Sequence, residues 1–367
     1  MRTLKYIAIS WTLWGISLYL FSPYLTILLE SSISSPVLIG LSYIISSIVG
    51  VVLINLLRLA KNSNVNLMIK IPLVTSGVGL LIMGLINSPL AAVIGLVLYN
   101  SYWLSVPFFY YALSSAEKEQ FSKTWAISML PALVLPVIGG MIVLNAGVRT
   151  VFVISGAIMM LSTLPLNWVK LNPEGESFQK EDINLLPLIF SVFPLSLALP
   201  FLYEVKFFEL SAVWLSYEIG EIVGIILTWV SWKSKNSLPI SLLIFSTVVI
   251  NSLVSVGGFY YGLSEAVLST GVGGVNPRSF RSAIRVALTE ASLWTIGYIV
   301  SSLAYIVSYS LPFIYAGLIA ILFSLLLLME VRSGKRPLQS LTSPIFMLVK
   351  VFEGALFEGI EPYFKFA

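Results

Sequence analysis

Four glutamates lie near the middle of long apolar runs of the sequence, where an ionised carboxylate is hard to accommodate. They are Glu218, Glu221, Glu265 and Glu290. If these runs cross a membrane, each charge at the bilayer centre costs about 2.5–3.5 kcal/mol even on the lenient insertion scale. We therefore expect the four carboxylates to face a cavity or polar partners, or to hold a proton for part of the time. All four are candidates for coupling to a proton or another cation.

Glu218 and Glu221 are three residues apart, so a helix presents both on one face. Two neighbouring carboxylates repel each other, which favours a state in which one of them holds a proton. The alternative is structural: the four acids would pair with Arg281, Arg285 or backbone donors as packing elements. Arg285 is also a candidate gating residue, because it can pair with an acid across a cavity.

The composition is that of a polytopic membrane protein. Hydrophobic residues make up 57% of the 367-residue chain and charged residues only 10%, against about 25% charged residues in soluble domains. The chain has neither Cys nor His, which removes disulfides, thiolate metal sites and the commonest neutral-pH proton carrier. Asp182 is the only Asp. We expect no metal, no cofactor and no nucleic-acid partner, since the net charge of +4 is spread along the chain in small clusters.

The apolar runs predict an all-α protein, because each is close to the roughly 20 residues that a helix needs to cross a bilayer. Twelve spans are predicted, at residues 5–29, 36–58, 66–86, 89–113, 123–146, 149–168, 184–205, 209–232, 238–256, 258–275, 280–307 and 311–329.

An internal repeat divides these spans into two sets of six. Residues 215–227 repeat the string at 41–53, with Tyr217 matching Tyr43 and Gly224 matching Gly50, whereas Glu221 replaces Ser47. A repeat of this length indicates a duplicated chain. The predicted parts are a six-helix bundle at 1–169, a cytoplasmic linker at 170–183, a second bundle at 184–330 and a cytoplasmic tail at 331–367 with an amphipathic helix.

Basic residues indicate the orientation. Of the 21 Lys and Arg residues, all but Arg149 and Lys206 fall on one predicted side, and the cytoplasmic side is the one that carries such an excess. Both termini are then cytoplasmic. We expect a monomer that spans the plasma membrane several times, with the lipid bilayer as its surroundings.

Two parallel six-helix repeats joined by a cytoplasmic linker are the plan of the major facilitator superfamily, which the chain resembles. Short motifs carry the resemblance further: Ser22-Pro23-Tyr24-Leu25, Ile39-Gly40-Leu41, Gly147-Val-Arg149-Thr-Val-Phe152, and Pro136 with Gly139 and Gly140. The last is similar to the end of an antiporter signature in that family. The loop after the second span departs from the family pattern, since residues 55–62 keep basic side chains but lack its Asp and its glycines.

The resemblance implies that spans 1, 4, 7 and 10 line a central cavity. Candidate substrate contacts are then Trp11, Trp14, Tyr99, Asn100, Trp103 and Ser269. Such aromatic walls suit amphipathic, aromatic or sugar-like solutes. Aromatic residues at span ends fit interfacial belts instead, the interpretation we give to Tyr110, Tyr111, Tyr260 and Tyr261. Pro136, Gly139, Gly140 and Gly297 are candidates for gating or close helix packing.

Taken together, the sequence predicts a secondary active transporter of a small-molecule substrate that works by alternating access. A proton is the expected coupling ion, and the antiporter-like motif favours export. The alternative is a transporter-like sensor or scaffold that moves no solute. A membrane-embedded enzyme is disfavoured, because the chain lacks His, Cys and a second Asp.

Overall fold

The computed structural model describes residues 2–59, 65–114, 117–169, 183–202, 211–233, 237–251, 257–308 and 310–333. Within these ranges every regular element is helical, as predicted. The α-helices are α1 (Arg2–Phe21), α2 (Leu25–Ser32), α3 (Pro36–Leu59), α4 (Val65–Leu85), α5 (Pro89–Tyr99), α6 (Val106–Ser114), α7 (Lys118–Met129), α8 (Leu135–Ala146), α9 (Val148–Leu161), α10 (Leu186–Leu202), α11 (Ser211–Val230), α12 (Ser237–Asn251), α13 (Gly257–Val275), α14 (Phe280–Val307) and α15 (Leu311–Ser333). Short 3₁₀ helices are η1 (Ser22–Tyr24), η2 (Asn100–Leu104), η3 (Leu130–Leu133) and η4 (Pro165–Trp168).

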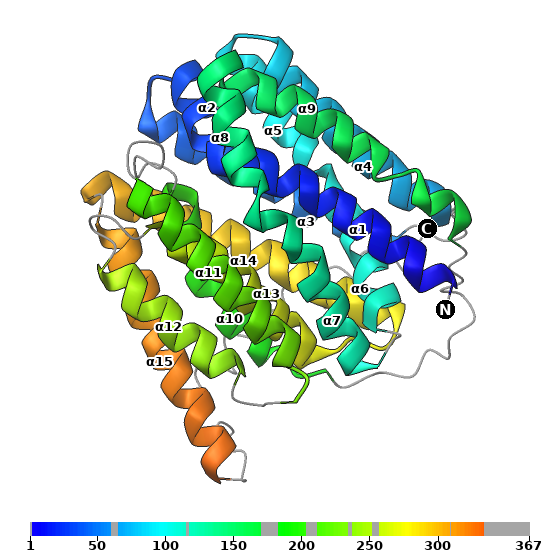
Figure 1. The fold of residues 1–367 in the computed structure, drawn as a ribbon, viewed down its shortest axis with the longest axis vertical. Coiled ribbons are helices and arrows are strands. Elements are labelled where there is room, and N and C mark those ends of the chain that lie inside the picture. The colour runs from blue at the N-terminus through cyan, green and yellow to red at the C-terminus, as the bar shows by residue number, and fades with distance from the viewer. Residues whose placement is uncertain are drawn as a thin grey trace, which may run out of the picture.

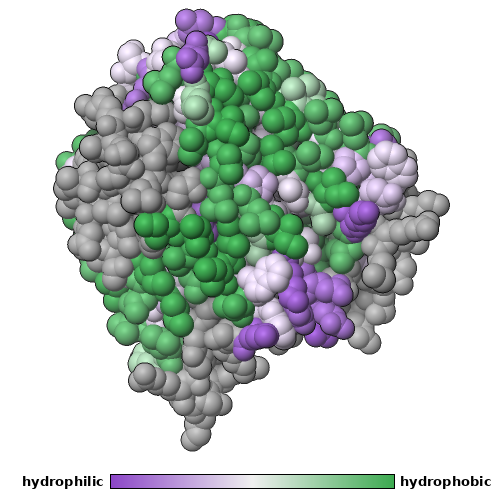
Figure 2. Space-filling view, viewed as in Figure 1, coloured by the Kyte–Doolittle hydropathy of each residue, from purple (hydrophilic) through white to green (hydrophobic). Residues whose placement is uncertain are grey.

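The helices confirm a multi-pass membrane protein. Eight helical segments in the described residues are long and apolar enough to cross a membrane, and three shorter apolar helices belong to the second half of the chain. On the face shown in Figure 2, hydrophilic side chains gather at the upper edge and at the lower right, with hydrophobic ones between them. The count of twelve spans stays a prediction, because parts of the second half lie outside the described residues. So do most of the predicted linker and nearly all of the predicted tail helix.

Helices of each half pack mainly on one another. In the first half α4 packs against α5 and α9, and α1 packs against α8 and α9. In the second half α11 packs against α13, α12 against α15, and α10 against α13, α14 and α15. Figure 1 shows the two groups side by side. The division into two domains with the boundaries given above stays a prediction.

The two halves meet through helices that the internal repeat relates. The repeated string lies on α3 and α11, and each of these helices crosses to the other half: α3 contacts α14, and α11 contacts α7. Gly40 allows a close approach between α3 and α14, since a Cβ at this position would lie 2.8 Å from Ser302 Oγ. The two helices that carry the repeated string therefore lie on opposite sides of the interface between the halves.

The fourth span is broken in mid-course, as α5, η2 and α6, and serines hold the break against α4. The Ser76 hydroxyl lies 2.8 Å from the Pro72 carbonyl oxygen and 2.7 Å from that of Tyr99. The Ser101 hydroxyl donates to the same Pro72 carbonyl at 2.9 Å. A break at membrane depth is tolerated where protein groups satisfy the freed backbone. These bonds fix the position of η2, which carries Asn100.

Polar contacts tie α4 to α9 at both ends of the pair. At one end the Arg149 guanidinium donates to the carbonyl oxygens of Met83 and Ile86, both at 2.9 Å. At the other end Lys70 Nζ donates at 2.7 Å to Asn167 Oδ1 of η4, which follows α9. These antiparallel helices therefore span the apolar layer with a polar anchor on each side.

Candidate functional site

A cavity of about 210 Å³ lies between the two halves and is lined by both of them. The first half contributes residues of α1, η1, α2, α3, α5, η2, α6 and α7, and the second half contributes residues of α13 and α14. Spans 1, 4 and 10 therefore line it, as the family resemblance implied. The seventh span, α10, contributes no described residue to the wall. Residues of the second, fifth and eleventh spans also line the cavity, because α3 and α7 contact the second half and α14 contacts both halves.

One wall of the cavity is a connected group of aromatic rings. Trp11 and Trp14 lie with ring centroids 4.5 Å apart, and Trp14 lies 5.3 Å from Tyr102. Tyr102 in turn lies 5.1 Å from Tyr99 and 5.2 Å from Trp103. The structure thus brings together the predicted substrate contacts of α1, α5 and η2. Their role in binding stays a prediction.

Gly50 sets the position of Trp103. A Cβ at residue 50 would lie 2.4 Å from Trp103 Cδ1, inside any normal contact distance. Only a residue without a side chain lets α3 approach the indole this closely. Asn100 lies at the start of the same 3₁₀ helix, where its amide donates to the Leu96 carbonyl at 2.9 Å, and it also lines the cavity.

A second wall comes from rings that the sequence analysis did not select. Tyr298 on α14 lies 5.6 Å from Tyr43 on α3 and 5.7 Å from Trp294, measured between ring centroids. The Tyr43 hydroxyl lies 3.1 Å from Thr26 Oγ1. Tyr43 belongs to the repeated string, and this was the one feature of the sequence that could have marked it as a residue of the site. The position of Trp294 and Tyr298 depends on how α14 packs on α3.

Among the described residues that line the cavity, Glu290 is the one acid. Its side chain is only 3% exposed, and its Oε2 accepts a 2.6 Å hydrogen bond from the Tyr110 hydroxyl. Tyr110 comes from α6 in the first half, so this bond joins the two halves. The interpretation of Tyr110 as part of an interfacial belt is wrong, because the ring is buried, with 2% exposed, and its hydroxyl has a carboxylate partner inside the protein.

The other predicted acids lie elsewhere. Glu221 is fully buried on α11 and is not among the residues that line the cavity. The side chains of Glu218 and Glu265 lie outside the described residues, so the pairing of Glu218 with Glu221 stays a prediction. Ser264, the neighbour of Glu265 on α13, lines the cavity wall.

Two further candidates are placed away from the cavity wall. The Ser269 hydroxyl lies 2.9 Å from Thr228 Oγ1, which ties α13 to α11. Arg285 is partly buried on α14, one turn before Glu290, and does not line the cavity.

The antiporter-like residues of α8 pack against the first span. The Tyr24 hydroxyl donates to the Pro136 carbonyl, and a Cβ at Gly139 would lie 2.6 Å from Tyr24 Cε2. Gly140 is also buried. In this structure these residues hold α8 against η1. Of the two roles considered for them, gating and close helix packing, their contacts are those of close packing.

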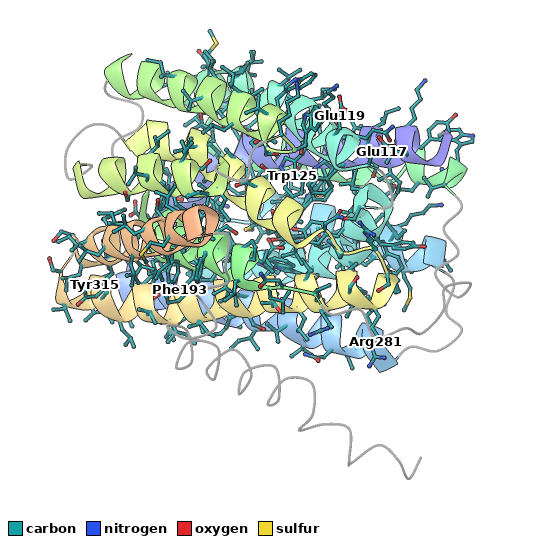
Figure 3. All side chains as sticks on the ribbon, turned by 90° about the horizontal axis from the view of Figure 1, so that it is seen from below. Glu117, Glu119, Trp125, Phe193, Arg281 and Tyr315 are labelled. Atoms are coloured by element: carbon teal, nitrogen blue, oxygen red, sulfur yellow. The ribbon has the colours of Figure 1, made fainter. Side chains whose placement is uncertain are left out.

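Contacts between the halves gather towards one end of the molecule. The Ser122 hydroxyl of α7 lies 2.9 Å from that of Ser231, which follows α11. The Lys123 ammonium lies 5.5 Å from the Trp229 ring centroid. Figure 3 shows Glu117, Glu119 and Arg281 towards this end of the molecule and Tyr315 at the opposite one. We call this the charged end.

Aromatic rings add to the contacts between the halves at the charged end. Phe280, the first residue of α14, lies 4.7 Å from Phe108 and 5.8 Å from Tyr111 between ring centroids. With the Tyr110–Glu290 bond, three residues of α6 thus contact α14: Phe108, Tyr110 and Tyr111.

Comparison with solved structures decides the fold. No known sequence family and no curated protein matches the chain. The human organic anion transporter MFSD10 (TETRAN) matches with 13% identity and a TM-score of 0.57, over 89% of this chain and 99% of that one. The E. coli fucose:proton symporter FucP matches with 13% identity and a TM-score of 0.56, over 88% of this chain and 97% of that one. The chain has the major facilitator fold.

The major facilitator fold accounts for the arrangement of the site. One solved structure is described as an organic anion transporter and the other as a fucose:proton symporter, and both match across nearly their whole length. In the described part of the chain, no group of three His, Cys, Asp or Glu side chains could hold a metal ion. The described residues that line the cavity offer aromatic faces, hydroxyls, one amide and one carboxylate.

Proposed function

We propose that this chain is a secondary transporter that carries a small solute through the cavity by alternating access. Three features support the proposal: the major facilitator fold, a cavity lined by both halves, and cross-half contacts gathered at the charged end. In such a protein the two halves rock about a central site and expose it to each side in turn.

A proton at Glu290 is the proposed coupling ion, and the Tyr110–Glu290 bond is the observation that carries this step. A hydroxyl bonds more strongly to an ionised carboxylate than to a neutral carboxyl group. The ionised form of Glu290 therefore favours contact between α6 and α14, and protonation weakens that contact. Opening the charged end requires these two helices to separate, so the proton and the conformational change are linked.

The orientation and direction form part of the same proposal. The charged end is the cytoplasmic one, with both termini inside and the protein in the plasma membrane as a monomer. The motif of Pro136, Gly139 and Gly140 supports export, with a proton moving inward as the solute moves outward.

Cysteine labelling tests alternating access without knowledge of the solute, because the chain has no natural Cys. Asn100→Cys places a thiol on the cavity wall of the first half, and Ser264→Cys places one on the wall of the second half. In oriented vesicles, a membrane-impermeant maleimide should label both variants from either side. Labelling of both positions from one side only, under every ion gradient, would indicate a sensor or scaffold.

Proton coupling needs a separate comparison. In Glu290→Gln the share of labelling from each side should no longer respond to pH. Glu30→Gln changes an exposed acid of α2 outside the cavity and should respond as the unmodified protein does. A Glu290→Gln variant that keeps the full pH response would contradict coupling at this residue.

A further inference from the structure

The cavity wall combines many aromatic faces with a single carboxylate. Among the described residues that line it, Glu290 is the only Asp or Glu, and no Lys or Arg is present. We infer that the solute is an organic cation with an apolar body, a solute class that neither similar transporter's description mentions. This inference rests on the proposed function, and it names the substrate class of the same site.

The aromatic faces favour a positive charge. The face of a Trp or Tyr ring carries negative electrostatic potential, so it attracts ammonium groups and repels anions. Trp11, Trp14 and Tyr102 form a continuous set of rings on the first half, and Tyr43 and Tyr298 face the cavity from the other wall. A cation between these walls would exchange its hydration shell for several ring faces.

Glu290 supplies the counter-charge. Its carboxylate is almost fully buried, and the described residues that line the cavity with it include no Lys or Arg, so a cationic group in the cavity gains a favourable Coulombic interaction with it in a poorly solvated space. Burying an anionic solute beside this carboxylate would instead place two like charges in a poorly solvated space. The wall therefore discriminates against organic anions by charge.

Trp14 adds a requirement for a hydrogen-bond acceptor on the solute. Its indole Nε1–H is buried beside the cavity and makes no hydrogen bond to any residue that the structure describes. A buried donor without an acceptor costs about 1–3 kcal/mol, so a solute that carries an ether, hydroxyl or carbonyl oxygen would satisfy it. The expected solute thus has a cationic centre, an apolar or aromatic body and one such oxygen.

Binding of three small probes to the purified protein tests the charge preference. Phenyltrimethylammonium is a cation, acetanilide is neutral and benzenesulfonate is an anion, and all three have one benzene ring. Quenching of tryptophan fluorescence measures each dissociation constant. We expect the cation to bind at least about tenfold more tightly than the other two, a factor that corresponds to a modest cation–π contribution. Equal binding of the three, tighter binding of benzenesulfonate, or no binding of the cation at millimolar concentration would overturn the inference.

Matched variants locate the binding. Glu290→Gln should weaken binding of the cation about tenfold and leave acetanilide unchanged, while Glu290→Asp keeps the charge and should keep most of the affinity. Glu30→Gln is the control acid. An unchanged affinity of the cation in a folded Glu290→Gln variant would overturn the assignment of the counter-charge.

A further pair of variants tests the acceptor. Trp14→Phe retains an aromatic face and removes the indole N–H, so it should weaken binding of acetanilide, which has a carbonyl oxygen, more than binding of phenyltrimethylammonium, which has none. Trp168→Phe, at a ring that is 62% exposed and outside the cavity, controls for the lost fluorophore. Equal losses for both probes in Trp14→Phe would overturn the role of the indole N–H.

The cysteine experiment separates failure of this inference from failure of the proposed function. Two-sided labelling of Asn100→Cys together with a preference for benzenesulfonate would leave the transporter proposal intact and overturn the cation. One-sided labelling together with a preference for the cation would leave the binding site intact and overturn transport.

Discussion

The Tyr110 hydroxyl of α6 donates a 2.6 Å hydrogen bond to Glu290 Oε2 of α14, across 180 positions of sequence. Both side chains are almost fully buried, and both line the cavity. This one hydrogen bond therefore lies in the cavity, joins the two halves and involves a side chain that can take up a proton. The proposed coupling depends on these three properties together.

Removing the donor of this bond should loosen the charged end. Hydrogen bonds to charged groups contribute about 1.5–3 kcal/mol, so Tyr110→Phe should raise the population open at this end about tenfold or more. The measurement is the rate at which maleimide, added on the side of the charged end, labels Asn100→Cys. Tyr315→Phe alters a partly exposed tyrosine at the opposite end and should leave the rate unchanged. Equal rates in the two variants would contradict the role of the bond.

A methyl group at Gly50 should disturb the cavity through Trp103. Gly50→Ala would place its Cβ against the indole, and overpacking of this kind costs about 1–3 kcal/mol. We expect a lower melting temperature and weaker binding of phenyltrimethylammonium. Gly84→Ala meets Val153 and the Arg149 carbonyl with similar tightness, away from the cavity. It should lower the melting temperature and leave binding unchanged, whereas a parallel loss of binding in both variants would show that Trp103 is not the cause.

Ser76, which holds the broken fourth span, should contribute more to stability than the neighbouring Thr75. Ser76→Ala removes a hydroxyl that links α4 to the end of α5, a contribution of about 0.6 kcal/mol on average for polar contacts between membrane helices and up to about 1.7. We expect lower thermal stability and faster hydrogen exchange in η2. Thr75→Ala removes a hydroxyl that bonds only within its own helix, to the Ile71 carbonyl. The same exchange rates in η2 for both variants would argue against the bond as its support.

Much of the fold could be predicted from the sequence, because a membrane imposes a length and a composition on every helix that crosses it. The repeat relates α3 to α11, and each of these helices contacts the other half. The close approach expected at Gly297 is confirmed, since a Cβ there would lie 1.8 Å from Ser196 Oγ on α10. Each of these predictions could be made from the local sequence or from the apolar surroundings that a membrane provides.

The site was harder to predict, because its decisive contacts join residues that are distant in sequence. Tyr110 lies near the end of a span, and composition alone favours the interface for such a residue. Its burial follows from the packing of α6 on α14, where Glu290 offers an acceptor. In the same way, Ser269 lies on a lining span but bonds to Thr228 of α11. Whether a residue of a lining helix faces the cavity or a neighbouring helix is decided by helix rotation, which this sequence does not specify.

A reversible lock at the charged end tests the central claim most directly. Ser122→Cys and Ser231→Cys replace two hydroxyls that lie 2.9 Å apart on opposite halves, a separation compatible with a disulfide after small side-chain adjustment. In vesicles that also carry Asn100→Cys, oxidation should confine maleimide labelling of residue 100 to the side away from the charged end, and reduction should restore labelling from both sides. Labelling from the charged end that persists in the oxidised protein would contradict alternating access through this cavity.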